Sequence, residues 1–315
     1  MTDKDKLDKK SPKPETPQRR WVRVVRAVFR PKPLMTAALL VCAVIFWPML
    51  QANLPDLTQN PEYRVTVADI EVNEPPHWVP HEFVEDAVER VGFPEEMSLL
   101  DESLTLEIAK LFARHPWVAE VKEVRKASFP ARLVVTLDYR RPVAMIEKRT
   151  GLYPVDASGV LLPKEDFSLS ATADYPAITG VRSTPPSLQG EVWDDPLVQG
   201  AARIAAALRT DWQTLDLRSI RVPPRTTEEI KLQDAQFSLL TSSGSTILWG
   251  RAPGVKHEKE LTVTQKIDRM KTYLADYGSF DAPAGPYEID IRQWQQISRK
   301  QIPASHDAQL PKEKF

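Results

Sequence analysis

Cysteine and histidine are scarce in this chain, and their scarcity excludes several kinds of site. The 315 residues include one cysteine and five histidines. Cys42 lies inside an apolar run, so the rest of the chain has no thiolate nucleophile and forms no disulfide bond. No two histidines have the spacing of a metal-ligand pair, and the His-Glu pairs at His81 and His257 lack the second histidine of a zinc-protease motif. A zinc site is therefore not expected.

Glycine is also sparse, with 11 glycines against 28 prolines. This balance favours short elements with stiff connections over glycine-rich ligand loops, and neither a phosphate loop nor a G-x-S-x-G nucleophile motif occurs. Adjacent carboxylates can act as acid and base, but turn-like settings favour surface or helix-cap roles for Glu95-Glu96, Asp194-Asp195 and Glu228-Glu229. We therefore predict no catalytic residue, cofactor, metal or small-molecule substrate, although a missing motif does not exclude an enzyme.

One uncharged apolar run is the most informative feature that is present. It spans Leu34 to Leu50, within an uncharged interval from Pro33 to Pro55. As a helix that interval would extend about 35 Å, enough to cross a hydrocarbon core of about 30 Å. Pro48 is expected to kink or end the helix. Because the run is longer than the apolar core of a cleaved signal peptide, we predict a retained transmembrane helix over residues 34–54.

The charges on the two sides of this run differ in sign. Residues 1–33 carry eleven basic and four acidic side chains, a net charge of +7, whereas the whole chain has 42 basic and 43 acidic residues. Basic residues beside a crossing stay in the cytoplasm, so the acidic remainder is expected outside. The arm, proline-rich over residues 11–17, is expected to be disordered and to contact anionic lipid, and no nucleic-acid partner is predicted.

Beyond the run, the spacing of apolar residues predicts a first α+β domain over residues 63–142. The expected order is strand, helix, helix, strand, strand, at residues 63–72, 81–91, 103–115, 118–126 and 132–139. The alternation of the first strand slips once, which is interpreted as a bulge. In the last strand Leu133, Val135 and Leu137 share one face. These elements predict a three-stranded sheet with two helices on one face.

A second, β-rich domain is expected over residues 143–302, followed by a disordered tail at 303–315. Its expected elements are two strand ends around a turn at Gly159, a helix starting at Asp195-Pro196, a hairpin around Ser243-Gly244 between residues 231–241 and 246–249, a helix through Val263, Ile267, Met270, Leu274 and Tyr277 that Gly278 closes, and a last strand carrying Tyr287, Ile289 and Ile291.

Two runs in this part carry specific motifs. The first is Pro116-Trp117-Val118, followed by Val121, Arg125, Phe129-Pro130-Ala131-Arg132-Leu133 and Arg140-Arg141-Pro142-Val143-Ala144. The second is the turn Val155-Asp156-Ala157-Ser158-Gly159. Through these runs the chain resembles the FtsQ/DivIB family of bacterial cell-division proteins, over about residues 20–301. Segments around Gly250, Lys266 and Ile289-Asp290-Ile291-Arg292 are similar to further family motifs, whereas Tyr139 and Phe129 replace the family's usual Glu and Trp.

The resemblance implies a single-pass protein of the bacterial inner membrane, with a cytoplasmic N-terminus, an exported POTRA domain and a β domain. It implies a non-catalytic divisome scaffold at the septum, which binds FtsB- and FtsL-type proteins and helps regulate septal peptidoglycan synthesis by FtsW/FtsI-type synthases. A last strand can be an edge to which a partner adds a strand. The expected contacts are Tyr287, Ile289, Ile291, Arg292 and Trp294 in the C-terminal strand, and Val118, Val121 and Arg125 at the POTRA edge.

The remaining motif residues are expected to be structural: Pro116, Trp117, Phe129, Pro130, Leu133, Arg140, Pro142, Val143, Ala144, Asp156 and Gly159. Two other functions stay open. The chain could be a membrane-anchored cell-wall hydrolase or transferase with an unrecognised site, or an outer-membrane biogenesis factor, since POTRA modules also serve there. For Trp294, folding onto its own domain is an alternative to contact with a partner.

Overall fold

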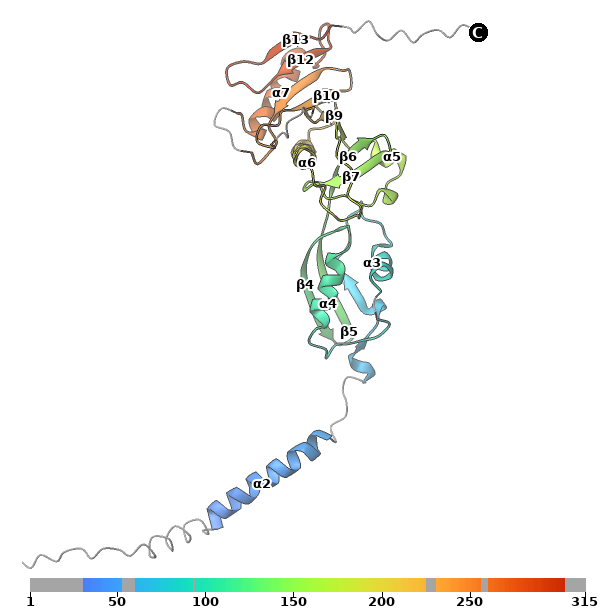
Figure 1. Cartoon of the computed structure of the whole chain (residues 1–315), viewed down its shortest axis with the longest axis vertical. Coiled ribbons are helices and arrows are strands. Elements are labelled where there is room, and N and C mark those ends of the chain that lie inside the picture. Colours follow the sequence, from blue (N-terminus) through green and yellow to red (C-terminus); the bar gives the residue numbers. More distant parts are fainter. Residues whose placement is uncertain (1–30, 53–59, 93, 225–230, 256–259, 304–315) are drawn as a thin grey trace, which may run out of the picture. The chain divides into compact units, whose positions relative to one another are not determined.

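The computed structural model describes residues 31–52, 60–92, 94–224, 231–255 and 260–303 (Figure 1). The chain divides into two compact units, residues 1–60 and 61–315. Apart from residues 31–33, the predicted basic arm lies outside the described residues, and so does the predicted tail beyond residue 303. The second unit mixes helices with large β-sheets, which confirms the predicted α+β class.

A single long helix, α2 (Pro31–Ala52), represents the first unit. Pro48 lies inside it and does not end it, since the helix continues to Ala52. The described apolar side chains of α2, such as Leu40, Val44 and Phe46, are all exposed. Judged on the described residues alone, no helix is both long enough and apolar enough to cross a membrane.

The first part of the second unit contains the predicted order of elements, with one short strand added. These are η2 (Pro61–Tyr63), β1 (Arg64–Val65), η3 (Val67–Asp69), β2 (Ile70–Val72), α3 (Phe83–Val91), β3 (Met97–Ser98), α4 (Leu104–Ala113), β4 (Val118–Ser128) and β5 (Ala131–Tyr139). A three-stranded sheet has the order β2-β5-β4, with β2 parallel and β4 antiparallel to β5. The short strands β1 and β3 form a separate antiparallel pair.

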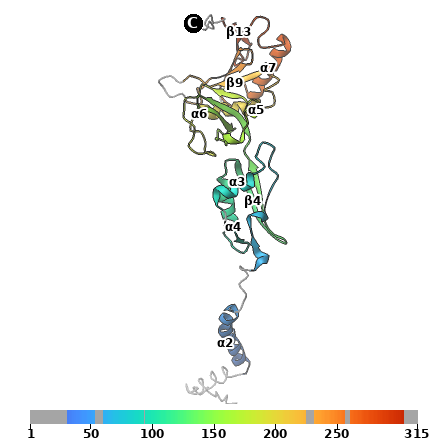
Figure 2. The ribbon, with the colours of Figure 1, turned by 90° about the vertical axis from the view of Figure 1, so that its right-hand side faces the viewer.

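The two helices cover one face of this sheet, as the apolar pattern predicts (Figure 2). Leu133, Val135 and Leu137 alternate along β5 and are at most 2% exposed. They share one core with Phe83 of α3 and Ile108 of α4. The core forms because strand side chains two residues apart point to the same side, where the apolar stripe of each helix meets them.

The predicted single strand over residues 63–72 is divided in the structure. Between β1 and β2 the chain makes a tight turn in which Oδ2 of Asp69 accepts hydrogen bonds from the backbone N–H and the hydroxyl of Thr66, each 2.8 Å long. The slip in alternation therefore marks a 3₁₀ turn and not a bulge, because the short side chain of Asp69 caps the backbone and interrupts the strand.

The second part is built on one eight-stranded sheet. Its elements are β6 (Pro142–Lys148), β7 (Gly151–Asp156), η4 (Lys164–Asp166), α5 (Leu169–Thr172), β8 (Ala177–Thr179), α6 (Pro196–Leu208), β9 (Leu217–Arg221), β10 (Phe237–Thr241), β11 (Thr246–Gly250), α7 (Val263–Tyr277), β12 (Tyr287–Asp290) and β13 (Ser298–Gln301). The strand order is β13-β12-β11-β10-β9-β8-β6-β7. Parallel and antiparallel pairs alternate irregularly, so the sheet is mixed.

A row of aligned apolar side chains crosses six strands of this sheet. Each strand from β6 to β12 except β7 contributes one fully buried residue, in register with the next: Ile146, Ile178, Ile220, Leu239, Ile247 and Ile289. Helices α6 and α7 supply Ile204 and Met270 to the same core. The row stops at β12, because Arg299 of β13 is the next residue in register.

Most predicted elements of the second part are present. Asp195 caps α6 by accepting the N–H of Leu197 at 2.9 Å, and the hairpin of β10 and β11 turns at Gly244. Its first strand begins at Phe237 rather than at residue 231, because residues 231–235 form turns. On α7 the predicted apolar face is partly wrong, since Tyr277 is exposed and Lys266 is buried.

Candidate functional site

The strand β12 is not the edge of the sheet. It pairs with β11 on one side and with β13 on the other. The prediction that residues 287–291 form the last strand with a free backbone edge is therefore wrong, and the edge belongs to β13. All four residues of β13 are exposed, so the sequence Ser-Arg-Lys-Gln has no apolar alternation to indicate a strand.

The five residues predicted to bind a partner here have different environments. Tyr287, Ile289 and Ile291 are at most 8% exposed and belong to the core. Arg292 is partly buried, with its Nη2 atom 2.7 Å from Oδ2 of Asp290. That hydrogen bond raises the pKa of Arg292 and lowers the pKa of Asp290. Trp294, which is 63% exposed, presents a large side chain to solvent.

The backbone of β13 has an inner and an outer side. The N–H of Ile302 donates to the carbonyl of Pro286 at 2.9 Å, which makes these residues a hydrogen-bonded antiparallel pair. Because such pairs alternate with non-bonded pairs, Lys300 and Ser298 also face β12. Arg299 and Gln301 therefore direct their backbone N–H and carbonyl groups outward, where an added strand would bind.

Side chains fix β13 from beneath. The guanidinium of Arg299 lies 4.6 Å from the ring centre of Tyr277 and 5.2 Å from that of Tyr287. These cation–π contacts explain why Tyr277 lies at the surface of α7. The side-chain amide of Gln301 donates to the carbonyl of Ala284 at 2.8 Å.

The turn between β12 and β13 is held by one arginine of α7. Arg269 donates through Nη1 to the carbonyls of Ile291 and Gln293, and through Nη2 to the carbonyl of Trp294 at 2.5 Å. A guanidinium suits this role because its donors are fixed in one plane. The arginine thus holds the backbone of Trp294 in the turn that precedes β13.

A buried charge cluster lies behind β11, where three of the sequence motifs meet. Glu260 accepts from Nζ of Lys266 at 2.6 Å and from Nη1 of Arg251 at 2.9 Å. Any side chain at Gly250 would collide with Oε1 of Glu260. Burial raises the pKa of Glu260, but these hydrogen bonds outweigh it and the net pKa is lowered. Burial lowers the pKa of Lys266, whose Nζ lies 4.8 Å from the ring of Trp249.

The second predicted contact lies on β4, which is an edge of the three-stranded sheet among the described residues. Val118 is only 1% exposed and belongs to the core. Val121 is partly buried and Arg125 is exposed. Only Arg125 of these three therefore offers its side chain to a partner. Whether either edge binds another protein stays a prediction.

The motif residues gather mainly where the two parts of the second unit join. Trp117 is buried, and its indole N–H donates to Oδ2 of Asp166 at 2.7 Å. The Nη1 atom of Arg140 lies 2.8 Å from Oδ2 of Asp156, whose other oxygen accepts the N–H of Val160 at 2.9 Å. These contacts connect the three-stranded sheet to the turn after β7. The partner Asp166 was missed because nothing in its local sequence indicates a long-range contact.

The other motif residues are structural in the same sense, with two exceptions. Gly159 adopts a φ of +79°, which a glycine accommodates without strain in the turn after β7. Five more motif residues are buried: Pro116, Leu133, Pro142, Val143 and Ala144. By contrast, Phe129 and Pro130 are exposed at the turn between β4 and β5, and Phe129 has 86% of its surface exposed.

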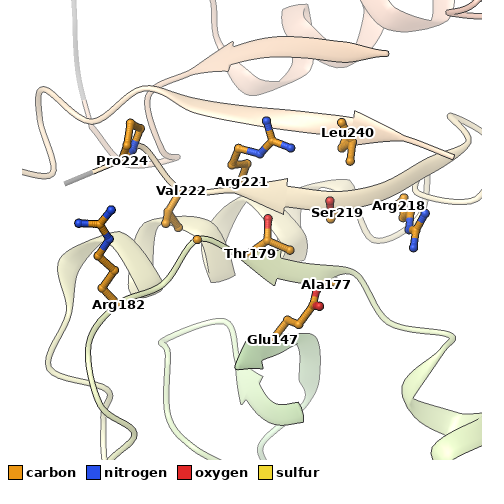
Figure 3. Close-up of a pocket in the computed structure, with 11 residues that line it drawn as sticks. Glu147, Ala177, Thr179, Arg182, Arg218, Ser219, Arg221, Val222, Pro224 and Leu240 are labelled. Carbon is orange, nitrogen blue, oxygen red and sulfur yellow. The ribbon is translucent and has the colours of Figure 1, made fainter. Parts of the chain in front are cut away.

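A depression of about 780 Å³ lies over strands β6, β8 and β9 (Figure 3). It contains three arginines and one acid: Arg182, Arg218, Arg221 and Glu147. Figure 3 shows Arg182 and Arg218 at opposite ends of the depression, so the guanidinium groups do not converge on one point. This arrangement does not form a compact anion site or bring together an acid and a base.

Within the described residues, no three metal-ligating side chains come close enough together to hold an ion. Comparison with models of protein families and with curated proteins finds no match to this chain. The exposed strand β13 and the turn that Arg269 holds are the features of the second unit that suit the binding of another protein.

Proposed function

We propose that this protein is a membrane-anchored scaffold of the FtsQ/DivIB type, which captures an extended segment of an FtsB-type protein by strand addition at β13. The observation that supports the proposal best is the outward backbone of Arg299 and Gln301 on an exposed strand. Backbone hydrogen bonds supply affinity in this mode of binding, and side chains beside the edge supply specificity. Trp294 is the natural anchor for such a segment, because exposed tryptophans are frequent interface hot spots.

The proposed anchor is the uncharged interval from Pro33 to Pro55, which extends past the described part of α2. The described apolar side chains of α2 have no protein core to cover them, and a lipid environment would remove them from water. The charge difference supports a cytoplasmic arm and an exported second unit, with the POTRA-like part first. FtsL-type proteins and FtsW/FtsI-type synthases are the further proposed partners.

Replacing Gln301 with proline tests strand addition directly. Gln301→Pro removes one outward N–H donor, whereas the matched control Gln301→Ala removes the same side chain and keeps that donor. We expect the proline variant to bind an FtsB-type ectodomain at least about tenfold more weakly, since losing the one N–H donor leaves a carbonyl of the partner strand unpaired, which costs about 1.4 kcal/mol or more. The control should bind within about twofold of the parent. Titration calorimetry measures both affinities.

Equal binding by the two variants would contradict strand addition at β13, provided that both melt at the temperature of the parent. In cells, the scaffold is expected at the division site, where a fluorescent fusion should localise, and its depletion should produce filaments. Turnover of purified peptidoglycan by the isolated second unit would instead support the cell-wall enzyme.

A further inference from the structure

The turn between β4 and β5 carries an unusually exposed aromatic side chain. Phe129 is 86% exposed and forms a two-residue turn with Pro130, and the neighbouring Ala127, Ser128 and Ala131 are also uncharged. Turns ordinarily carry glycine, proline, asparagine, aspartate or serine, so Pro130 is a usual turn residue and Phe129 is not. Phe129 makes no contribution to the core of its own domain, which Leu133 and Val135 of β5 complete without it. The ring of Phe129 is therefore available to an apolar or interfacial environment outside the domain.

Two further exposed leucines lie at the same end of the domain. In the described residues 60–142, the large apolar side chains that are exposed are Leu100, Leu106 and Phe129. Nζ of Lys126, near the end of β4, donates to the carbonyl of Asp101, beside Leu100. Leu106 lies in the first turn of α4, which starts at Leu104. The opposite end of β4, at Val118, lies about 35 Å away along the strand.

The chain also begins this domain at the same end. The carbonyl of Tyr63 accepts the N–H of Leu99 at 2.8 Å, and Glu71 lies 3.4 Å from Arg132, close to the turn. Eight residues, 53–60, separate Ala52 of α2 from Pro61. A fully extended chain of that length spans only about 30 Å. The covalent length of this segment therefore limits how far Pro61 can lie from Ala52.

We propose that Phe129, together with Leu100 and Leu106, inserts into the headgroup region of the lipid bilayer. The inference rests on the proposed membrane anchor. Aromatic side chains favour this interface, and apolar faces enter it by about 5–10 Å. One aromatic ring binds lipid weakly in solution, but the short tether raises its effective concentration at the surface to the millimolar range.

The charges around the turn are compatible with lipid headgroups. Arg125 is exposed on the strand that leads into the uncharged turn, where its long basic side chain can reach lipid phosphates. Of the nearby acids, Glu71 pairs with Arg132 and Asp101 accepts the N–H of Ser103 at 2.8 Å, whereas Glu102 is exposed. An inserted turn would hold the three-stranded sheet at a fixed angle to the membrane.

A fluorescent probe beside Phe129 tests the insertion. The full chain with Cys42→Ser receives Ser128→Cys, is labelled with an environment-sensitive dye and is reconstituted into phosphatidylcholine–phosphatidylglycerol vesicles that contain nitroxide lipids. The matched control is Ser170→Cys, also exposed and next to the 87% exposed Leu169. We expect several-fold stronger quenching at position 128 than at position 170, as for a group within the interface.

Variants of Phe129 separate insertion from mere closeness to the vesicle. Phe129→Glu should remove the extra quenching at position 128, and Phe129→Trp should keep it. Because the side chain is exposed, neither change should lower the melting temperature. Equal quenching at positions 128 and 170 would overturn the inference and would leave a protein partner as the occupant of this surface.

The native Cys42, labelled in the unmodified chain, distinguishes the two proposals. Quenching at Cys42 without extra quenching at position 128 overturns the insertion and leaves the membrane anchor intact. If the label at Cys42 is not quenched, both the anchor and the insertion are overturned.

Discussion

His115 is almost fully buried at the end of α4, and both of its ring nitrogens have hydrogen-bond partners. Its Nδ1 atom accepts the N–H of Trp117 at 3.2 Å, and its Nε2 atom lies 3.0 Å from Oδ2 of Asp86. This arrangement requires the neutral ring with its proton on Nε2. Burial lowers the pKa of His115, and although the hydrogen bond to Asp86 opposes this effect, the net pKa is lowered.

His115 is therefore expected to make the second unit less stable in mild acid. The unfolded chain takes up a proton near the ordinary pKa of 6.5, before the folded chain does. Stability is fully present above that pH and is lost as the pH falls toward the lowered pKa, by about 1.4 kcal/mol for each pH unit that separates the two pKa values. Thermal melting of a fragment starting at Pro61, at pH 7.5 and 5.5, measures the loss. The variant His115→Gln should show a smaller pH dependence, and an equal dependence would contradict the assignment.

Some of these features could be predicted from the sequence and others could not. Pro116 correctly predicts that α4 ends before it, because a residue before proline disfavours helical geometry, but the helix ends at Ala113, two residues before the predicted end at His115. The pairing of His115 with Asp86 joins two helices, and no local pattern encodes it. The burial of Lys266 is equally hidden from the local sequence, because Glu260 and Trp249 of other segments give it a charged partner and an apolar wall.

At the scale of elements, the Arg269 contact determines how the turn after β12 is presented. The three carbonyls that it binds belong to consecutive parts of one turn, from Ile291 to Trp294. Without Arg269 these carbonyls would lack a hydrogen-bond donor, which would make this conformation of the turn less stable.

Replacing Arg269 with methionine is expected to loosen the turn and leave the core intact. We expect faster hydrogen exchange over residues 293–301, a loss of about 1–3 kcal/mol in local stability and weaker capture of an FtsB-type ectodomain. Lys271→Met is the matched control, because Lys271 makes only an exposed ion pair with Asp211 at 2.7 Å. If exchange over the turn is the same in both variants, Arg269 does not hold it.

Elements with an apolar face were predictable, and elements without one were not. The alternation of β5 gave correct positions because burial determines that pattern. The strand β13 consists of exposed polar residues and forms only because β12 offers backbone partners. Because β13 was not predicted, the free edge of the sheet was assigned to β12, one strand too early. The order of the eight strands was likewise beyond prediction, since register depends on contacts between distant segments.

At the scale of the whole molecule, charge and hydropathy predict the topology. Residues 1–33 carry a net charge of +7, and the second unit contains its own apolar cores. This asymmetry favours a cytoplasmic arm and an exported second unit.

Ser243, at the exposed tip of the hairpin of β10 and β11, provides a test of that topology. A Ser243→Cys variant should react with a membrane-impermeant maleimide in cells whose outer layers are permeabilised. The parent, whose only cysteine is Cys42, should stay unlabelled because lipid shields that residue. Labelling of Ser243→Cys only after lysis would reverse the orientation.

The apolar row ends at β12, and this affects how firmly β13 is held in the sheet. With Arg299 in register with Ile289, β13 adds no side chain to the apolar row. We therefore expect β13 to open at a lower free energy than the strands that carry the row. A partner strand that paired with β13 would hold it in place, and part of the binding free energy would be used to order β13. Small changes in how well β13 is ordered would then change the affinity for a partner strand, even when they arise far from the contact with that partner.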